Sequence, residues 1–166
     1  RLKIMKKVCI VGYGAIGPVH AKALEGVENA QFTAVCDVDE EKRTLCREKY
    51  SVKEYDDFDK MLEDADIDCV HICTPHYLHF EMIQKSLAAG KDVVVEKPVT
   101  MTKEQFEALK ALDGIERVCV VFQNRLNPCV QRMKQLVESK ELGEVQGARG
   151  MVTWYRSKEY YESGAW

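Results

Sequence analysis

VCIVGYGAIG, residues 8–17, joins a run of four apolar residues to a motif of three glycines, and the apolar residues that follow recur at helical spacing. A strand, a glycine turn and a helix in this order are typical of a dinucleotide-binding βαβ unit. Gly12 permits the tight turn, Gly14 lets a pyrophosphate approach the backbone, and Gly17 lets the helix pack against the strand. The free N–H groups and the dipole at the helix start favour a bound phosphate. We therefore expect the loop to bind a cofactor through Gly12, Tyr13, Gly14, Ala15, Ile16 and Gly17.

The rest of the chain repeats this alternation of short apolar runs and helical stripes. The apolar runs are residues 8–11, 32–36, 69–73, 93–95 and 118–122, and the stripes include residues 16–23, 58–65 and 80–87. Thr102 and Gln105 have the spacing of a capping box, while Asn127 before Pro128 is typical of an N-cap and a first helical residue. Strands that are apolar throughout and separated by helices predict an α/β fold with a doubly wound parallel sheet of the Rossmann type.

Asp37 ends the second apolar run, about where the ribose-binding acid of such a unit belongs. Its carboxylate would accept hydrogen bonds from the adenosine ribose hydroxyls and would repel a 2′-phosphate, which favours NAD over NADP. The alternative is that Asp37 only caps a strand or the following helix. Arg43 lies further along the chain, so NADP stays open as the less favoured cofactor.

The third apolar run ends in a turn that faces the same edge of the sheet as the glycine loop. Ligands of open α/β sheets bind beyond the carboxyl ends of the strands, so we expect Thr74 and Pro75 to contact the cofactor. His76 and His79 could form a metal pair, but no other ligand completes a set, and a capping role for His79 is favoured. We interpret His20 and His71 as structural.

The fourth apolar run ends in Glu96, Lys97 and Pro98. A lysine at this position opens onto the cleft where a nicotinamide ring would lie, and its cation could hold a substrate hydroxyl. The alternative is a surface turn with a solvated charge.

These motifs together resemble the glucose–fructose oxidoreductase and inositol dehydrogenase family (Gfo/Idh/MocA). The matching residues, in chain order, are Gly12, Gly14, Gly17, Asp37, Thr74, Pro75, His79, Glu96, Lys97 and Pro98. The resemblance implies hydride transfer between a sugar or cyclitol carbinol and the nicotinamide. It implies that Lys97 is the active-site lysine, that Glu96 and His79 belong to the cofactor site, and that the bond before Pro98 is often cis. His76 departs from the pattern, since relatives commonly carry Asn there.

Two later stretches, residues 123–128 and residues 154–156 with Tyr160 and Tyr161, resemble the branch of this family that oxidises nucleotide-linked sugars. This branch includes UDP-N-acetyl-glucosaminuronate 3-dehydrogenases. Arg125 and Arg156 could pair with a phosphate or carboxylate, and Asn127 lies beside them in these motifs. The neighbouring aromatic residues could stack on a sugar or a base. The alternative is that all of these residues pack a second sheet or a subunit interface.

The pattern changes after Gly143. Residues 144–156 resemble a longer strand with mixed faces, and the aromatic tail Tyr160, Tyr161 and Trp166 follows. We predict an NAD-binding domain over residues 1–124, and over residues 125–166 a connecting helix and the first strand of a truncated α+β domain for substrate binding and oligomerisation. The resemblance implies a catalytic Asp and His beyond residue 166. We therefore expect this chain to bind NAD with little turnover, and the complete protein to be a homo-oligomer.

Composition excludes several other classes of protein. The net charge of -3 gives no reason to expect a nucleic acid or an anionic membrane as partner. No apolar run approaches the roughly 20 residues that span a bilayer. The seven cysteines include no Cys-x-x-Cys pair, which favours buried thiols in a reducing, cytoplasmic compartment over a metal site.

Two other functions share the glycine loop and the acidic residue. A non-catalytic NAD-sensing module would keep both but would not need Lys97. A methyltransferase that uses S-adenosylmethionine would not need the pair Lys97 and Pro98.

Overall fold

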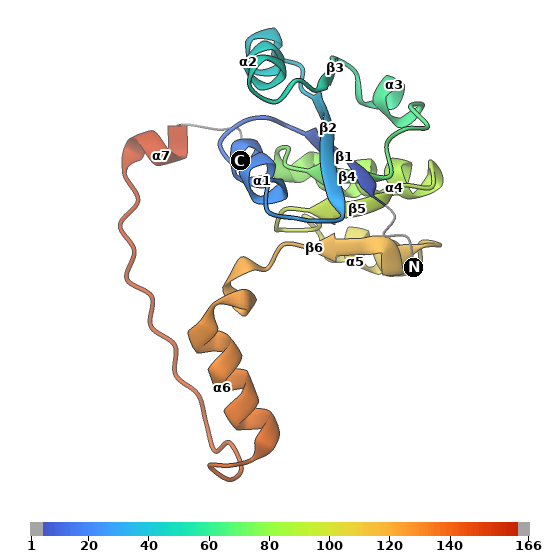
Figure 1. The fold of residues 1–166 in the computed structure, drawn as a ribbon. Coiled ribbons are helices and arrows are strands. Elements are labelled where there is room, and N and C mark those ends of the chain that lie inside the picture. Colours follow the sequence, from blue (N-terminus) through green and yellow to red (C-terminus); the bar gives the residue numbers. More distant parts are fainter. Residues whose placement is uncertain (1–4, 163–166) are drawn as a thin grey trace. The chain divides into compact units, whose positions relative to one another are not determined.

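The structure is a computed structural model that describes residues 5–162. The chain divides into two units, Arg1–Val121 and Phe122–Trp166. In the first unit, six parallel strands form one sheet in the order β3-β2-β1-β4-β5-β6 (Figure 1). The strands are β1 (Lys6–Val11), β2 (Ala30–Cys36), β3 (Lys53–Tyr55), β4 (Cys69–Ile72), β5 (Asp92–Val95) and β6 (Val118–Val120). The Rossmann-type sheet that the sequence predicts is therefore confirmed.

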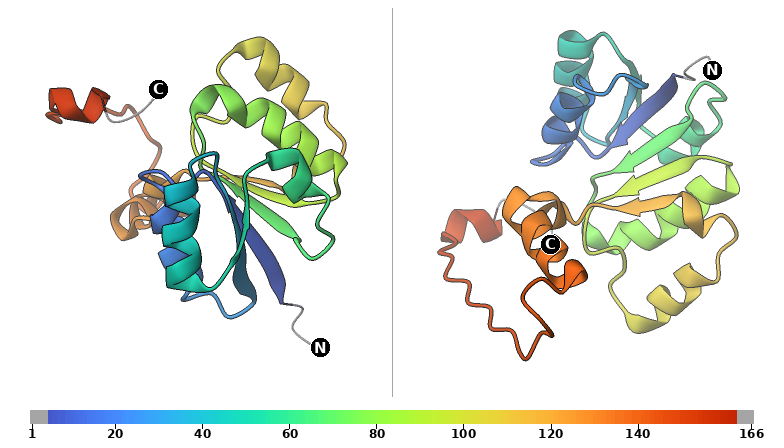
Figure 2. Two further views of the ribbon diagram at one scale, coloured as in Figure 1. Left: turned by 90° about the horizontal axis from the view of Figure 1, so that it is seen from above. Right: turned by 60° about the horizontal axis from the view of Figure 1, so that its bottom comes forward.

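Helices cover both faces of this sheet. The helices of the first unit are α1 (Gly17–Leu24), α2 (Glu40–Tyr50), α3 (Phe58–Leu62), α4 (His79–Ala88) and α5 (Lys103–Lys110), with short 3-10 helices η1 (His76–Leu78) and η2 (Ile115–Arg117). The left view of Figure 2 shows α1 and α2 on one side and α4 and α5 on the other. Ile83 of α4 belongs to one hydrophobic cluster with Val70 and Ile72 of β4, and Ala21 of α1 belongs to a second cluster with Ile10 of β1.

The strand order reverses direction between β1 and β4, because β1 pairs with β2 on one side and with β4 on the other. The chain leaves β1 for α1 on one face and leaves β4 for α4 on the other. The carboxyl ends of both strands therefore open onto one crevice, which is where open α/β sheets bind ligands. The Gly12 N–H donates to Cys36 O at 2.8 Å, and the Cys73 N–H donates to Val11 O at 2.8 Å. These bonds hold the ends of β1, β2 and β4 together.

The two capping signals have different outcomes. Thr102 caps α5, since its side chain accepts from Gln105 N at 3.2 Å, while Gln105 Oε1 accepts from the Met101 N–H at 2.9 Å. The return bond of the box thus reaches the residue before the cap. Asn127 occupies the cap position of α6 (Pro128–Ser139), but its side chain makes no capping hydrogen bond.

The second unit contains η3 (Gln123–Leu126), α6 and α7 (Lys158–Glu162). No strand forms over residues 144–156, where the sequence predicts one. A strand needs a neighbour to accept its backbone hydrogen bonds, and the described part of the second unit contains no other strand. Trp166 of the predicted aromatic tail lies outside the described residues. Among the described helices, none combines the length and the apolar character needed to cross a membrane.

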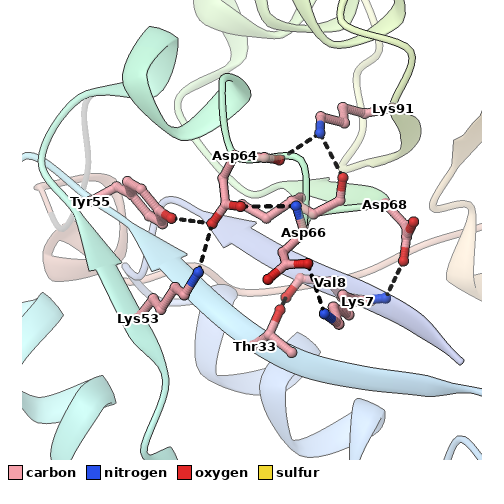
Figure 3. A network of polar contacts seen from close by, with 10 residues as sticks. Lys7, Val8, Thr33, Lys53, Tyr55, Asp64, Asp66, Asp68 and Lys91 are labelled. Atoms are coloured by element: carbon pink, nitrogen blue, oxygen red, sulfur yellow. Dashed lines mark hydrogen bonds and ion pairs between the residues drawn. The ribbon is translucent and has the colours of Figure 1, made fainter.

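Asp64 is the centre of a polar network that joins β3, the loop between α3 and β4, and the start of β1 (Figure 3). Its Oδ2 accepts from Tyr55 OH at 2.5 Å and from Lys53 Nζ at 3.0 Å, and its Oδ1 accepts from the Asp66 N–H at 2.9 Å. Lys91 Nζ donates to the carbonyl oxygens of Asp64 and Ile67, both at 2.7 Å. The network joins the loop after α3 to the sheet.

This network makes the stability of the fold sensitive to acid. The hydrogen bond from Tyr55 OH, helped by those from Asp66 N and Lys53, lowers the pKa of Asp64 from 3.8 to about 2. Because the carboxylate is favoured in the folded state, its contribution is complete above pH 4 and is lost as the pH falls towards 2. We expect Asp64→Asn to lower the free energy of unfolding by about 2 kcal/mol at neutral pH and to flatten its decline between pH 4 and 2.

Chemical denaturation at neutral pH and between pH 4 and 2 measures both effects. Asp66→Asn is the matched control, because the Asp66 side chain is 65% exposed whereas that of Asp64 is 17% exposed. The same loss in both variants would contradict the assignment to Asp64.

Candidate functional site

The glycine loop connects β1 to α1 at the carboxyl end of the sheet. Gly12 has φ of +87°, a conformation that glycine tolerates far better than other residues. A Cβ on Gly12 would lie 2.8 Å from the carbonyl carbon of Cys73, and a Cβ on Gly17 would lie 2.5 Å from the Gly12 carbonyl oxygen. A Cβ on Gly14 would meet nothing within 4 Å. The first and third glycines therefore allow close packing, and the second leaves open space beside the backbone.

The first turn of α1 is suited to an anion. Its N-cap residue, Ile16, provides no side-chain hydrogen bond. In the described part of the chain, the N–H groups of Gly14 and Ala15 donate no hydrogen bond, and both residues are exposed. Unpaired N–H groups at a helix start, together with the helix dipole, attract phosphate oxygens. These residues and the open space at Gly14 fit a pyrophosphate.

Asp37 follows β2 and faces the same loop. Its Oδ2 accepts from the Tyr13 N–H at 2.6 Å, and its Oδ1 accepts from the Asp39 N–H at 2.9 Å. Each carboxylate oxygen keeps a further acceptor position for a ribose hydroxyl. Arg43 Nη1 donates to the Asp37 carbonyl oxygen at 2.8 Å, so Arg43 braces the backbone here. It is Asp39, with its side chain accepting from Glu41 N and Lys42 N, that caps α2.

The turn after β4 packs directly on the glycine loop, since a Cβ on Gly12 would also lie 2.9 Å from Thr74 N. The Thr74 hydroxyl contacts Met82 Sδ at 3.4 Å, and Pro75 precedes η1. His79 is fully buried, with Nε2 2.9 Å from Thr74 O and Nδ1 2.8 Å from Pro98 O. The capping role favoured for His79 is therefore wrong, because its ring points into the core and leaves neither nitrogen for a helix end or a cofactor. Instead it links the turn after β4 to the turn after β5.

The turn after β5 carries Glu96, Lys97 and Pro98. The Lys97–Pro98 peptide bond is cis, and the Lys97 side chain is exposed. Glu96 is largely buried, and its Oε2 accepts from the Lys97 N–H at 3.3 Å. The Glu96 N–H donates to Ile72 O at 3.0 Å, which places this turn beside the end of β4. Lys97 thus presents an exposed cation at the same edge as the glycine loop.

Two histidines that sequence reasoning left as structural also reach this edge. His20 of α1 lies 3.1 Å from Glu96 Oε1 through Nε2, and 3.1 Å from His71 Nδ1 through its own Nδ1. No spacing along the chain signals this contact, because the three residues come from different elements. Within residues 5–162, no group of three or more His, Cys, Asp or Glu side chains is arranged to hold a metal ion.

The family is shown by a match over most of this region. The family model described as "Oxidoreductase family, NAD-binding Rossmann fold" (GFO_IDH_MocA) matches residues 6–123, well over half of the chain. The chain belongs to the Gfo/Idh/MocA family. The matched part is the NAD-binding Rossmann domain of that family, and NAD is the cofactor that its glycine loop and Asp37 fit.

Similar members of this family act on inositols. Inositol 2-dehydrogenase of Rhizobium meliloti is 33% identical over 139 residues, which cover 82% of this chain and 42% of the relative. Myo-inositol 2-dehydrogenase of Thermotoga maritima is 29% identical and covers 83% of this chain and 42% of the relative. The chain therefore spans less than half the length of these curated relatives.

Solved structures of the family show the same fold. Scyllo-inositol dehydrogenase of Lactobacillus casei, with bound NAD(H) and scyllo-inositol, superposes with a TM-score of 0.78 at 30% identity, covering 84% of this chain and 42% of that one. WlbA dehydrogenase of Bordetella pertussis, in complex with NADH and UDP-GlcNAcA, has a TM-score of 0.84 at 28% identity, covering 96% of this chain and 50% of that one.

The remaining predicted substrate residues lie in the second unit. The Arg125 guanidinium is 5.7 Å from the Phe122 ring centroid. The backbone carbonyl oxygen of Arg125 accepts a hydrogen bond from Gln131 Nε2. The Arg156 guanidinium stacks between Trp154 and Tyr160, 4.7 and 4.8 Å from their ring centroids. Asn127 is exposed at the start of α6. The contribution of these residues to a substrate site stays a prediction.

Asp37→Asn tests the basis of cofactor choice. Asparagine keeps an oxygen for the Tyr13 N–H but removes the negative charge that would repel a 2′-phosphate. We expect the ratio of NADP to NAD affinity to rise about tenfold or more, since one charge interaction at close range is worth at least that factor. Calorimetric titration with both cofactors measures the ratio. Asp39→Asn, which removes a nearby charge and keeps a good cap, is the control; an equal shift in both variants would show a general charge effect.

Proposed function

We propose that the whole protein is an NAD-dependent dehydrogenase that transfers a hydride between a secondary alcohol of a sugar, nucleotide sugar or cyclitol and the nicotinamide. The observation that carries the proposal is the exposed Lys97 at the carboxyl end of β5, at the same sheet edge as the glycine loop and Asp37. A module that only sensed NAD would need the loop and Asp37 but no cation at this place.

The bound nicotinamide would accept or donate the hydride. Residues of the NAD-binding domain would position the cofactor and the substrate. Gly14, Ala15 and Asp37 would hold the pyrophosphate and the adenosine ribose. The Lys97 ammonium would hold the reacting hydroxyl and favour negative charge that develops on its oxygen.

The substrate class rests on the family and on chemistry in the second unit. One similar structure contains scyllo-inositol and another contains UDP-GlcNAcA, and each of these ligands includes a polyhydroxylated ring. The stacked guanidinium of Arg156, together with Arg125, suits an anionic substrate such as a nucleotide sugar. We therefore favour a nucleotide sugar over a free cyclitol, and include Asn127 among the residues that would contact it.

We also propose a cytoplasmic location and a homo-oligomer for the whole protein. All seven cysteines are free. Burial raises the pKa of the Cys36 thiol to about 12, and a thiol with so high a pKa is inert, as expected of a protein in a reducing compartment.

A substrate screen tests the proposed function. The whole protein would be incubated with NAD and, separately, myo-inositol, scyllo-inositol, glucose 6-phosphate and UDP-N-acetylglucosaminuronic acid, and NADH formation would be followed by absorbance. We expect turnover with at least one compound, and most with the nucleotide sugar. NAD binding without turnover of any compound would favour a sensing module, and failure to bind NAD would contradict the cofactor site.

A further inference from the structure

Three side chains from three elements form a continuous hydrogen-bonded row beneath the cofactor edge. His71 belongs to β4, His20 to α1, and Glu96 follows β5. The His71 Nδ1 to His20 Nδ1 distance is 3.1 Å, and the His20 Nε2 to Glu96 Oε1 distance is also 3.1 Å. The two imidazole rings meet edge to face, with centroids 5.2 Å apart and planes at 82°. Such a row fixes the orientation of its middle member from both sides.

The row has a defined direction. A carboxylate only accepts hydrogen bonds, so His20 Nε2 carries the proton that it donates to Glu96. Burial, and next the neighbouring His20, lowers the pKa of His71 to about 4, so His71 is neutral near pH 7. A neutral His71 can carry its proton on Nδ1 and donate it to His20 Nδ1. The proton of His20 then lies on Nε2, the nitrogen that faces Glu96.

His20 connects the two halves of the cofactor site. It lies in α1, one turn after Gly17, and the start of this helix is the pyrophosphate side. Glu96 lies next to Lys97 on the nicotinamide side, and its second oxygen, Oε2, accepts from the Lys97 N–H. The His20 and Glu96 side chains are 10% and 12% exposed, so water competes little for their contact.

We propose that His20 is a positioning residue that holds the Glu96 carboxylate, and through it the backbone of Lys97, in register with the glycine-loop helix. This inference rests on the proposed function for its effect on turnover, but not for its effect on NAD binding. His20 touches neither substrate nor cofactor in this role. It acts only through Glu96.

Two substitutions separate the contacts of His20. A glutamine amide nitrogen lies near the position of histidine Nε2, and an asparagine amide near that of Nδ1. His20→Gln therefore keeps a donor for Glu96 and loses the contact with His71, whereas His20→Asn does the reverse. We expect His20→Asn to weaken NAD binding by the whole protein about tenfold or more, because a charged acceptor loses its buried partner, and His20→Gln to stay within about threefold of the parent.

A double-mutant cycle with Glu96→Ala gives the second readout. If His20 acts through Glu96, His20→Asn adds nothing to the effect of Glu96→Ala on NAD affinity or on turnover. The proposal would be overturned if the losses of His20→Asn and Glu96→Ala multiplied in the double variant. It would also be overturned if His20→Gln and His20→Asn lost equal affinity. Thermal unfolding of every variant shows which proteins are folded at the assay temperature, and only the affinities of folded variants are compared.

The cycle also distinguishes this proposal from the proposed function. A parent protein that binds NAD but turns over no polyol would contradict the dehydrogenase assignment, and the NAD affinities of the four proteins would still decide the role of His20.

Discussion

Gly17→Ala is expected to cause a large loss of stability, about 3 kcal/mol or more in the free energy of unfolding. The added Cβ would lie 2.5 Å from the backbone carbonyl oxygen of Gly12, and real Cβ atoms do not approach other atoms this closely. The obstacle is backbone, so no side-chain rotation relieves it. Gly12 cannot retreat either, because it packs on the turn after β4. Either α1 must move away from β1 or the loop must open.

Gly14→Ala is the matched control for this prediction. A Cβ there meets nothing within 4 Å, so the stability of the fold should change by less than about 1 kcal/mol. The methyl group would occupy the space proposed for the pyrophosphate, and NAD affinity should fall. Denaturant unfolding and NAD titration of both variants measure the two properties separately. A stable Gly17→Ala variant, or a Gly14→Ala variant with full NAD affinity, would contradict the roles assigned to these glycines.

Lys97→Met is expected to lower turnover by the whole protein about 100-fold or more, because a preorganised charge at a reacting oxygen typically contributes at least that factor. Methionine keeps most of the apolar length of lysine and removes the cation. Lys97 is exposed, so the fold should be unaffected. NAD affinity should change by less than about fivefold, because the substitution leaves the Lys97 N–H and its contact with Glu96 in place and removes only an exposed charge.

The control for Lys97 is Lys103→Met, at the exposed first residue of α5. Steady-state rates with the substrate found in the screen, together with NAD titration, separate catalysis from binding. Unchanged turnover in Lys97→Met would support a protein that senses NAD without using this lysine. Equal losses in both variants would point to a general effect of charge.

Buried elements of this fold are predictable from sequence because covering both faces of a strand demands a mainly apolar run. β1, β4 and β5 are examples, with Val8, Val70 and Val95 each almost wholly buried. Two elements gave no such signal. β3 has three residues at the sheet edge, and none of them is fully buried. α2 has eleven residues, of which only Cys46 is buried, so it carries no apolar stripe.

In the second unit, by contrast, the sequence predicted a strand that does not form. Residues 144–156 have the composition of a strand, but composition cannot supply the neighbour that a strand requires. Strand propensity in such a segment describes a capacity to pair. It becomes structure only beside another strand.

The candidate site was predictable where its residues directly follow a predicted strand. The glycine loop, Asp37 and Lys97 each follow a strand, and parallel strands bring their carboxyl ends to one edge. His79 was assigned wrongly because its partners, Thr74 and Pro98, lie 5 and 19 residues away and are backbone carbonyl groups. His20 was left out of the site for a similar reason, since its contact with Glu96 joins residues 76 positions apart.

The carboxylate of Asp37 braces the Tyr13 and Asp39 N–H groups as well as facing the ribose position. Anyone who redesigns this scaffold for another nicotinamide cofactor therefore alters the loop and the selectivity in a single step. A successful design must keep an acceptor for the Tyr13 amide, as asparagine would at position 37, before it recruits a cation for the extra phosphate. The same constraint applies to natural drift: a lineage that exchanged its cofactor would have to pass through sequences that still offer this amide an acceptor.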